Sequence, residues 1–542
     1  MHARGFLAFV AAIGCLGACL GGCEVGSNYH PPAPAMPGAF ARGLPQTQPT
    51  TRDAPAITRS IELTRWWHAL GDPELDSLVE RAVAANPDIE IAFTRLQQAR
   101  TQETVVAGLS YPVADFSGGA GRGSGTNSTK SRIAGPLDAG TNTAGLREIT
   151  QVVGFDAGWE LDLFGKYRRQ IEATRADTQA AAEARNAVLI TVISDVARAY
   201  MDSRALQVRL HIALDDLRTQ RQTVDLVQTR FNRGMTNELD LVLAQRELAT
   251  IQAEISPLQE GVEQAKRRVA VLLGLFPEDL SRELTGLASL PAPPDEIQPG
   301  LPVELLRRRA DIRQAERELA AATARIGVAT ANLFPRVAVT AGLGLQGQGL
   351  GREPERNTFL WSAGPTAYWP LLDFGTLDAL VGEQDLQTHA ALVNYKRTVL
   401  LAIEEVNNAI GEYSAEKNRL QSLSQALVAS QRAVDVATQR YERGLTDFLN
   451  VLDAQRQFYD LQDQYALAQE AVVLQFIAVY KGLGGGWEGF APAGPPPAPR
   501  PAIIAAVARS LHPNAEQPTD TPTKPHDASA EERDSKPDST GK

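Results

Sequence analysis

The chain has 542 residues, of which 43 % are hydrophobic and 22 % are charged, and its formal net charge is −11. This acidic balance, without a basic face, argues against nucleic acid as a partner. All three cysteines, Cys15, Cys19 and Cys23, lie within the first 23 residues, which excludes disulfides and cysteine-bound metals from the rest of the chain.

Residues 1–22 have the pattern of a secretory signal peptide. Arg4 supplies a positive start, an apolar stretch runs from Phe6 to Leu20, and the sequence Leu-Gly-Gly-Cys ends at Cys23. This ending resembles a bacterial lipobox and predicts that Cys23 becomes the lipidated first residue of the mature chain. A similar motif ending at Cys19 is an alternative, as is ordinary cleavage without a lipid. No later stretch has 18 or more consecutive apolar residues, so any crossing of a membrane must use strands.

Residues 23–60 are rich in proline and predict an extended tether. A helical pattern follows over residues 64–100, with Leu75, Leu78, Val79 and Ala82 on one face.

A β-hairpin is predicted over residues 112–163. The alternation is weak after Pro112, but it is strict over 153–163, where Asp156, Glu160 and Asp162 share the polar face. Between these two strands lies a loop rich in glycine and serine.

Residues 165–275 predict two long helices joined by a tight turn. Gly234 is expected to end the first helix in a left-handed conformation, and Thr236 to cap the second. A seven-residue apolar repeat predicts left-handed supercoiling over about 65 residues, or roughly 100 Å. With one polar break, the repeat consists of Leu189, Val196, Ser203, Leu210, Leu217, Val224 and Phe231.

The chain then repeats itself. The sequence RYERGLTDFLNVLDAQRQ at 440–457 matches RFNRGMTNELDLVLAQRE at 230–247, which lies 210 residues earlier, and the segment around Asp311 matches that around Asp88 at a distance of 223 residues. A proline-rich linker at 290–302 separates a first repeat at 61–289 from a second at 303–487.

The second repeat predicts a helix, a hairpin at 335–371 and a long helix pair at 375–484. Its seven-residue thread consists of Val399, Val406, Tyr413, Leu420, Leu427, Val434 and Tyr441. Residues 488–542, rich in proline and then in charge, are expected to form a disordered tail.

The four predicted strands have about ten residues each, the length that crosses an outer membrane when tilted. Trp159, Trp361 and Trp369 lie near strand ends or in apolar faces, as in an interfacial aromatic belt. A soluble sandwich is the alternative, but carboxylates at 156, 160 and 162 suit a water-filled lumen better. Because the smallest membrane barrel has about eight strands, the barrel must be shared between identical chains, and two or three copies are both possible.

Several long segments resemble the outer membrane efflux protein family, in particular its lipoprotein members that serve resistance-nodulation-division pumps. They are CEVGSNYHPPAPAMPGAF after the lipobox, WWHALGDPELDSLVERAVAANPDI, ELLRRRADIRQAERELAAATARIGVATANLFPRV and the two RGxT turns. The resemblance is collinear over residues 20–487, with Ala310 in place of a usual proline and an additional tail. It implies a mainly α fold with a β-barrel part: a homotrimer whose twelve-stranded outer membrane barrel continues into a periplasmic helical barrel.

The function that this resemblance implies is a passive exit duct for drugs or other small toxic compounds. A periplasmic adaptor and an inner membrane transporter are the implied partners, and a lipid anchor would hold the protein in the outer membrane. Enzymatic activity, a cofactor and a metal are not expected, because HExxH, P-loop and GxSxG motifs do not occur in a fitting context. A channel for type I protein secretion and a non-conducting envelope scaffold are the alternatives.

In the family the two turns form the periplasmic tip, which is both the gate and the surface that binds the adaptor. The docking candidates here are Arg230, Gly234, Thr236, Arg440, Gly444 and Thr446. Their alternative role is to cap the helices.

For the gate, Asp453 matches a lumenal aspartate of relatives, and Asn450 takes the place of a second. Three symmetry-related copies of Asp453 would form a charged constriction, whereas the alternative is an ion pair with Arg456 at i+3. Relatives also hold the closed state with a tyrosine–aspartate hydrogen bond, which maps to Tyr441 and Asp240. Simple apolar packing of Tyr441 is the alternative there.

Overall fold

The computed structural model describes residues 24–34, 36–40, 63–122, 149–280, 283–286, 289–294, 302–348 and 359–490. Cys23, the expected lipidation site, and residues 491–542 of the tail lie outside these ranges. Within the ranges, no helix combines the length and the apolar character that crossing a bilayer requires.

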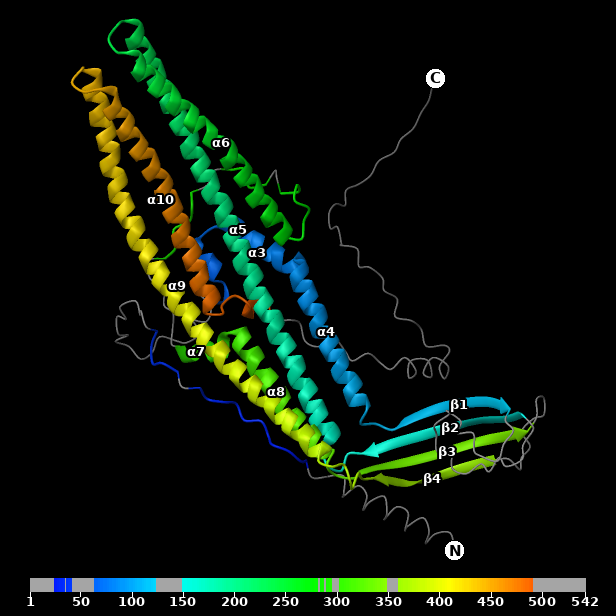
Figure 1. The fold of residues 1–542 in the computed structure, drawn as a ribbon. Helices are drawn as coiled ribbons and strands as arrows, with labels where there is room; N and C mark the ends of the chain where they lie inside the picture. Colours follow the sequence, from blue (N-terminus) through cyan, green and yellow to red (C-terminus); the bar gives the residue numbers. More distant parts are fainter. Residues whose placement is uncertain are drawn as a thin grey trace, which may run out of the picture. The chain divides into compact units, whose positions relative to one another are not determined.

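The described chain contains two copies of one succession of elements, as the sequence repeat predicts (Figure 1). The first copy has α4 (Pro87–Gly108), β1 (Val113–Arg122), β2 (Ile149–Leu161), α5 (Lys166–Asn232) and α6 (Glu238–Leu272). The second has α8 (Ala310–Ala331), β3 (Arg336–Gln348), β4 (Phe359–Tyr368), α9 (Thr376–Glu442) and α10 (Phe448–Gly482). Corresponding helices have equal lengths: 22 residues for α4 and α8, 67 for α5 and α9, and 35 for α6 and α10. The duplication is therefore kept in three dimensions.

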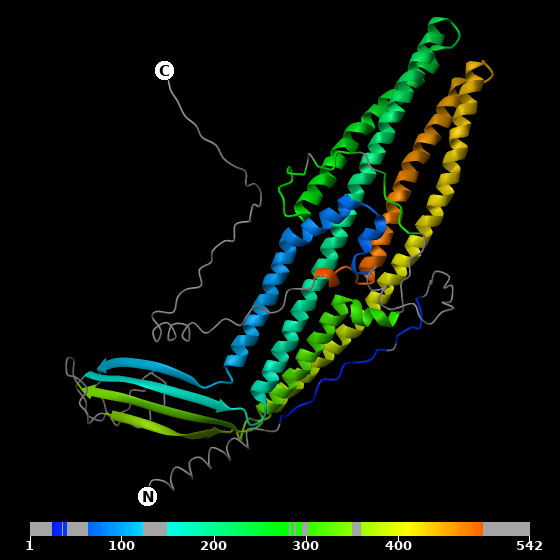
Figure 2. The same cartoon turned by 180° about the vertical axis from the view of Figure 1, so that it is seen from behind.

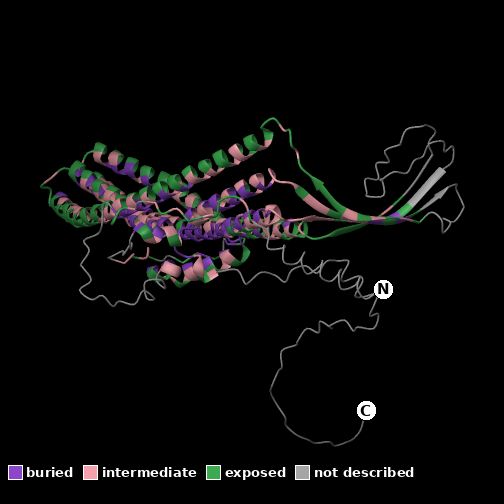
Figure 3. Cartoon of the chain, turned by 90° about the horizontal axis from the view of Figure 1, so that it is seen from below, coloured by how far each residue is buried: buried purple, intermediate pink, exposed green. Residues whose placement is uncertain are grey.

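The long helices form the frame of both repeats. Helices α4 and α6 lie end to end along α5, and α8 and α10 lie end to end along α9 (Figures 1 and 2). At about 1.5 Å per residue, α5 and α9 are each roughly 100 Å long. Buried and exposed positions alternate along these helices (Figure 3). Phe231, at the end of the first predicted seven-residue thread, is exposed. The threads otherwise supply these buried side chains: Leu189, Val196, Ser203 and Leu217 on α5, and Val399, Val406, Tyr413 and Tyr441 on α9.

The four strands form one antiparallel sheet in the order β1-β2-β3-β4. Phe116 pairs with Phe155, Phe155 with Leu343, and Leu343 with Trp361, so these side chains form one apolar row across the sheet. All four are exposed, Trp361 by 72 %. An apolar row of this size, open in the single chain, indicates a face that an apolar environment covers.

Two strands end earlier than the alternation predicts. β2 ends one residue before Asp162, whose carboxylate accepts hydrogen bonds from the backbone N–H groups of Tyr167 and Arg168 at 3.2 and 3.0 Å and so begins α5. β4 ends at Tyr368 rather than at residue 371, ahead of Pro370, which has no N–H to donate.

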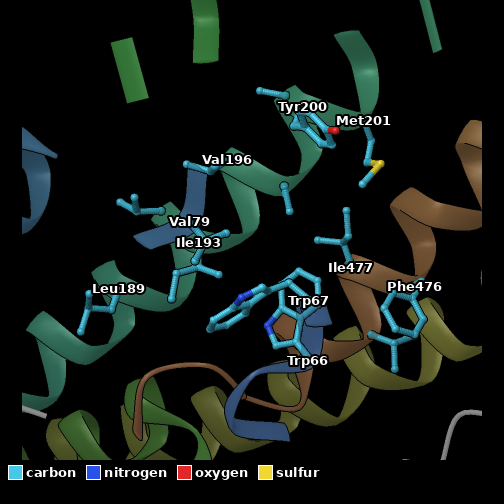
Figure 4. Close-up of a cluster of buried hydrophobic side chains, with 14 of the residues drawn as sticks. Trp66, Trp67, Val79, Leu189, Ile193, Val196, Tyr200, Met201, Phe476 and Ile477 are labelled. Carbon is cyan, nitrogen blue, oxygen red and sulfur yellow. The ribbon is translucent and has the colours of Figure 1, made fainter. Parts of the chain in front are cut away.

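The main hydrophobic core lies where the two repeats meet, around two consecutive tryptophans (Figure 4). Trp66 and Trp67 belong to the short helix η1 (Trp66–Leu70), and each is 1 % exposed. α5 of the first repeat supplies Ile193 to this core, and α10 of the second supplies Phe476, whose ring centroid lies 6.3 Å from that of Trp66. The core therefore joins the two repeats into one unit.

The helical segment predicted over residues 64–100 is divided into η1, α3 (Pro73–Ala85) and the first part of α4. Gly71 ends η1 in the left-handed conformation, with φ of 64°. Asn86 separates α3 from α4, because its side-chain oxygen accepts a hydrogen bond from the N–H of Asp88 at 2.8 Å and so begins a new helix at Pro87.

The prediction that the disordered tail begins at residue 488 is wrong for its first three residues. Glu488–Phe490 form the short helix η4. Phe490 stacks on Trp67 with ring centroids 6.2 Å apart, and its carbonyl accepts a hydrogen bond from Arg185 at 2.9 Å. These contacts hold the segment on the core.

Candidate functional site at the helical tips

The turns α5–α6 and α9–α10 are the two tips, and they share one backbone geometry. Gly234 and Gly444 have φ angles of 67° and 72°, the left-handed conformation predicted for both. At the first tip, the N–H of Met235 donates to the carbonyl of Arg230, and the N–H of Gly234 to that of Phe231, both at 2.9 Å. The second tip repeats both bonds at the equivalent positions. This pair of bonds is a common helix ending that fixes the chain direction, so each tip presents a defined surface.

The residues that begin the second helix of each pair lie one position after the predicted threonines. Asn237 caps α6, since its side-chain oxygen accepts a hydrogen bond from the N–H of Asp240 at 2.9 Å, and Asp447 takes the same place before α10. The Thr236 hydroxyl bonds the Asp240 carboxylate instead, and Thr446 accepts a hydrogen bond from a side chain four residues later. Both threonines thus tie the turn to the helix that follows it.

Large apolar side chains are exposed at equivalent positions of both tips. Met235 and Leu239 are 59 % and 63 % exposed, and Leu445 and Leu449 are 63 % and 61 % exposed. Apolar side chains in exposed turns gain free energy when a partner covers them. Our sequence analysis missed these four residues, although comparison of the two repeats would have found them, because both pairs stay apolar within polar turns.

The two predicted docking arginines have different surroundings. The guanidinium of Arg230 lies 4.5 Å from the ring centre of Tyr441 and donates to the carbonyl of Glu442 at 3.3 Å, so it joins the first tip to the second. Arg440, the equivalent residue, is exposed. One arginine therefore connects the tips, and the other is presented at the surface.

The predicted hydrogen bond between Tyr441 and Asp240 is absent. The hydroxyl of Tyr441 is buried without a hydrogen-bond partner among the residues that the structure describes, and the Asp240 carboxylate bonds Thr236. The ring of Tyr441 instead packs on Phe448 with centroids 5.5 Å apart, below the guanidinium of Arg230. The alternative given above, apolar packing, is what the structure has at this position.

Asn450 and Asp453 lie one turn apart, and both are exposed on α10. Asp453 accepts a hydrogen bond from the side-chain amide of Gln457 at 3.0 Å. Its alternative partner, Arg456, pairs with Glu247 of α6 at 2.5 Å and is therefore not bound to Asp453. The Asp453 carboxylate thus stays at the surface of the chain, as a charged constriction would require.

Two ion pairs connect α5 and α6 to α10, and our sequence analysis predicted neither. Besides the pair of Glu247 with Arg456, Arg209 of α5 pairs with Asp463 of α10 at 2.6 Å. The partners are 209 and 254 residues apart in the chain, so no local pattern could show them. These pairs connect the helix that carries the predicted gate residues to the first repeat.

The helices α5 and α10, which these ion pairs join to their neighbours, also carry carboxyl groups that are largely withdrawn from solvent. Burial raises the pKa of Asp216 to about 7, and repulsion by Asp215 and Glu254 adds to the shift. Burial, together with the neighbouring Asp202, also raises the pKa of Glu470 to about 7. These helices therefore contain carboxyl groups that take up protons near neutral pH.

In the described part of the chain, no group of three or more histidine, cysteine, aspartate and glutamate side chains could hold a metal ion.

Comparison with known proteins gives matches to both repeats. The family model described as outer membrane efflux protein matches residues 78–275 and 301–485. Nodulation protein T of Rhizobium leguminosarum bv. trifolii is 30 % identical over 477 residues, which are 88 % of this chain and 97 % of that protein. The cation efflux system protein CusC of Escherichia coli K12 is 27 % identical over 475 residues, 87 % of this chain and 98 % of that protein.

Solved structures agree with these matches. The outer-membrane channel OprN has a TM-score of 0.75 and 35 % identity, covering 86 % of this chain and 100 % of its own. The open state of the Neisseria gonorrhoeae MtrE outer membrane channel has a TM-score of 0.70 and 26 % identity, covering 87 % and 100 %. These similarities confirm the predicted fold class and the predicted function of an outer membrane efflux channel. The chain belongs to the outer membrane efflux protein family.

Proposed function

We propose that three copies of this protein form the outer membrane exit channel of a tripartite efflux system, a duct for drugs or other small toxic compounds. The sheet carries the proposal: β1 and β4 are its outer strands, and each has one edge without a partner strand among the described residues. A strand edge has free N–H and C=O groups, which are too costly to expose to lipid. Both edges therefore need a neighbour.

A head-to-tail ring supplies that neighbour to both edges at once. When β4 of one chain pairs with β1 of the next, the ring closes without a free edge, and three copies give twelve strands. The same ring brings α9, which follows β4, onto α4 of the next chain, which precedes β1. Both helices carry exposed apolar side chains that such contact would bury: Leu386 and Leu400 on α9, and Ile91, Phe93 and Val105 on α4.

Engineered cysteines test the ring, because the natural cysteines all lie within the first 23 residues. Ser117→Cys in β1, combined with Ser362→Cys or Thr366→Cys in β4, should give disulfide-linked dimers and trimers in isolated outer membranes. A matched control with Asp115→Cys and Ser117→Cys, both in β1, should stay unlinked. Purified trimers should also conduct ions across planar bilayers. A monomer that does not conduct ions would overturn the proposal and would favour the alternative function of a non-conducting envelope scaffold.

The lipid anchor at Cys23 is part of the proposal. Lipidation places the N-terminus at the outer membrane and leaves the helices in the periplasm. Palmitate labelling that is lost in Cys23→Ser and kept in Cys19→Ser is the expected result. Equal labelling in both variants, or none in the natural chain, would reject Cys23.

The tips are the proposed docking surface for a periplasmic adaptor, which an inner membrane resistance-nodulation-division transporter supplies with substrate. Their exposed apolar pairs and Arg440 support this assignment. Gly444→Trp, a bulky change in the second turn, should abolish efflux while trimers still assemble. Full drug tolerance in this variant would reject the docking surface, and loss of protein export with intact drug tolerance would favour type I secretion.

A further inference from the structure

Residues 24–29, here called the strap, lie in a seat formed by α5 and α8. The N–H of Val25 donates to the carbonyl of Phe164 at 3.3 Å, at the junction between β2 and α5. The hydroxyl of Tyr29 donates to Glu316 at 2.9 Å, and its ring packs against a small cluster of buried alanines. The strap thus follows the base of the helices directly after Cys23.

One buried arginine holds the strap. The side chain of Arg169 is 3 % exposed and forms an ion pair with Glu24 at 3.3 Å. Its guanidinium donates to the carbonyls of Val25 and Gly26 at 3.2 and 3.4 Å and to the side-chain oxygen of Asn28 at 2.7 Å. A guanidinium offers five donors in a rigid plane, and here it reaches four of the six strap residues.

Two glycines allow this close approach. An added Cβ at Gly26 would lie 2.5 Å from the Cα of Gly327, and one at Gly327 would lie 2.8 Å from the side chain of Arg169. Gly26 also has φ of 90°, which side chains rarely permit. The strap and α8 therefore meet backbone to backbone, and the seat admits no larger residue at either position.

The duplication supplies an internal comparison. Helices α9 and α4 are the repeat equivalents of α5 and α8, at distances of 210 and 223 residues, and they differ at the seat positions. The equivalents are Ala379 for Arg169, Thr104 for Gly327, Leu386 for Ala176, Gln97 for Ala320 and Gln98 for Ala321. The arginine and the small residues occur only in the copy that holds the strap, so they are a specialised seat rather than a general feature of the repeat.

We infer that this seat, with Arg169 as its clamp, is a positioning site for the lipid-modified N-terminus; the inference rests on the proposed lipidation of Cys23. Cys23 is bonded directly to Glu24, and consecutive Cα atoms are about 3.8 Å apart. The clamped strap therefore holds the acyl chains within two residues of the contact of Val25 with the junction at Phe164. If the strap were released as far as Tyr29, about six residues would separate Cys23 from its point of attachment, and the lipid could move by roughly 20 Å. This distance is a large part of the bilayer core, which is about 30 Å thick. The clamp thus fixes the depth of the anchor relative to the sheet.

Chymotrypsin cleavage after Tyr29 in the purified full-length trimer tests the clamp, because this cut separates the N-terminal residues from the rest of the chain. Arg169→Ala and Gly327→Thr, which introduces the residue of the repeat equivalent, should be cut at least tenfold faster than the natural chain. Arg175→Ala is the matched control, since Arg175 lies on the same helix and pairs with Glu103. An unchanged rate in both seat variants would overturn the clamp.

Positioning is tested separately by inserting six Gly/Ser residues between Cys23 and Glu24, which lengthens the anchor and leaves the seat intact. This variant should keep the slow cleavage after Tyr29. It should nevertheless lower the amount of SDS-resistant trimer in the outer membrane at least threefold, and Arg169→Ala should do the same. Natural trimer levels in both variants would overturn the positioning role. Mass spectrometry detects the cleavage with or without palmitate, so absence of lipid in the natural chain would reject lipidation while the clamp result still stands.

Discussion

The ion pair of Glu247 with Arg456 gives a quantitative test of the gate. The Glu247 side chain is 8 % exposed, and two nitrogens of Arg456 reach it at 2.5 and 2.7 Å. Arg456 lies three residues after Asp453, so the pair holds the proposed constriction helix on α6. Glu247→Gln keeps the side-chain shape and removes the charge, which weakens both hydrogen bonds.

The expected effect is large because the trimer has three such pairs. Hydrogen bonds to charged groups contribute about 1.5–3 kcal/mol. We take the lower end, about 1.5 kcal/mol for each chain, because the Arg456 side chain is 42 % exposed. If the three tips open together, the loss is about 4.5 kcal/mol, which changes the ratio of closed to open channels by more than about a thousandfold.

Single-channel recording in planar bilayers measures this ratio. Glu247→Gln and Arg456→Gln should each raise the open fraction, and the double variant should add little to either. Glu260→Gln is the matched control, because its partner Arg267 lies on the same helix. A closed state as stable as that of the natural trimer in Glu247→Gln would refute the reasoning.

Further predictions concern the buried carboxyl groups, the tips and the core. The folded-state pKa of Asp216, about 7, lies above its ordinary value of 3.8, so its contribution to stability is complete below about pH 4 and is lost as pH rises through 7. Asp216→Asn should therefore raise the free energy of unfolding at pH 8, by up to about 4 kcal/mol, and change it little at pH 4, as measured by denaturant titration. Tyr441→Phe should leave the closed state unchanged, since the hydroxyl has no partner within the described residues; a higher open fraction would instead support a hydrogen bond of Tyr441 that holds the closed state. Trp66→Ala should lower the free energy of unfolding by about 3–5 kcal/mol, whereas a loss below about 1 kcal/mol would contradict the central place of this tryptophan in the core.

Local patterns in the sequence were sufficient for much of the fold. Alternation marked the strands, glycine marked both turns, and the repeat fixed the equal lengths of α5 and α9. Each of these signals arises from neighbouring residues, because side-chain direction has a period of two in strands and 3.6 in helices. The strand ends at Asp162 and Pro370 differed because single residues with special hydrogen bonding ended the pattern.

The contacts at the candidate site were less accessible to sequence analysis. The pair of Glu247 with Arg456 joins residues 209 positions apart, and the clamp of Arg169 on the strap joins residues more than a hundred positions apart. A proline-rich segment without periodicity predicts only an extended tether, and it carries no local signal of the surface that holds it. The pairing of Asp240 with Tyr441 came from the resemblance to relatives, whereas in this chain the Asp240 carboxylate bonds Thr236, four residues away.

Equivalent positions of the two repeats that carry different residues indicate where the repeats differ in function. Asp240 and Asn450 are repeat equivalents, and so are Glu247 and Gln457, yet only Glu247 has an arginine of the other repeat as its partner. In the proposed ring of three chains, the duplication predicts that α6 and α10 also meet between chains, where the position equivalent to Glu247 carries the uncharged Gln457. A charge-assisted pair within the chain and an uncharged side chain between chains make the two contacts unequal in strength. We therefore expect the closed state to depend on the contact of α6 with α10 within each chain, and the contact between chains to contribute less.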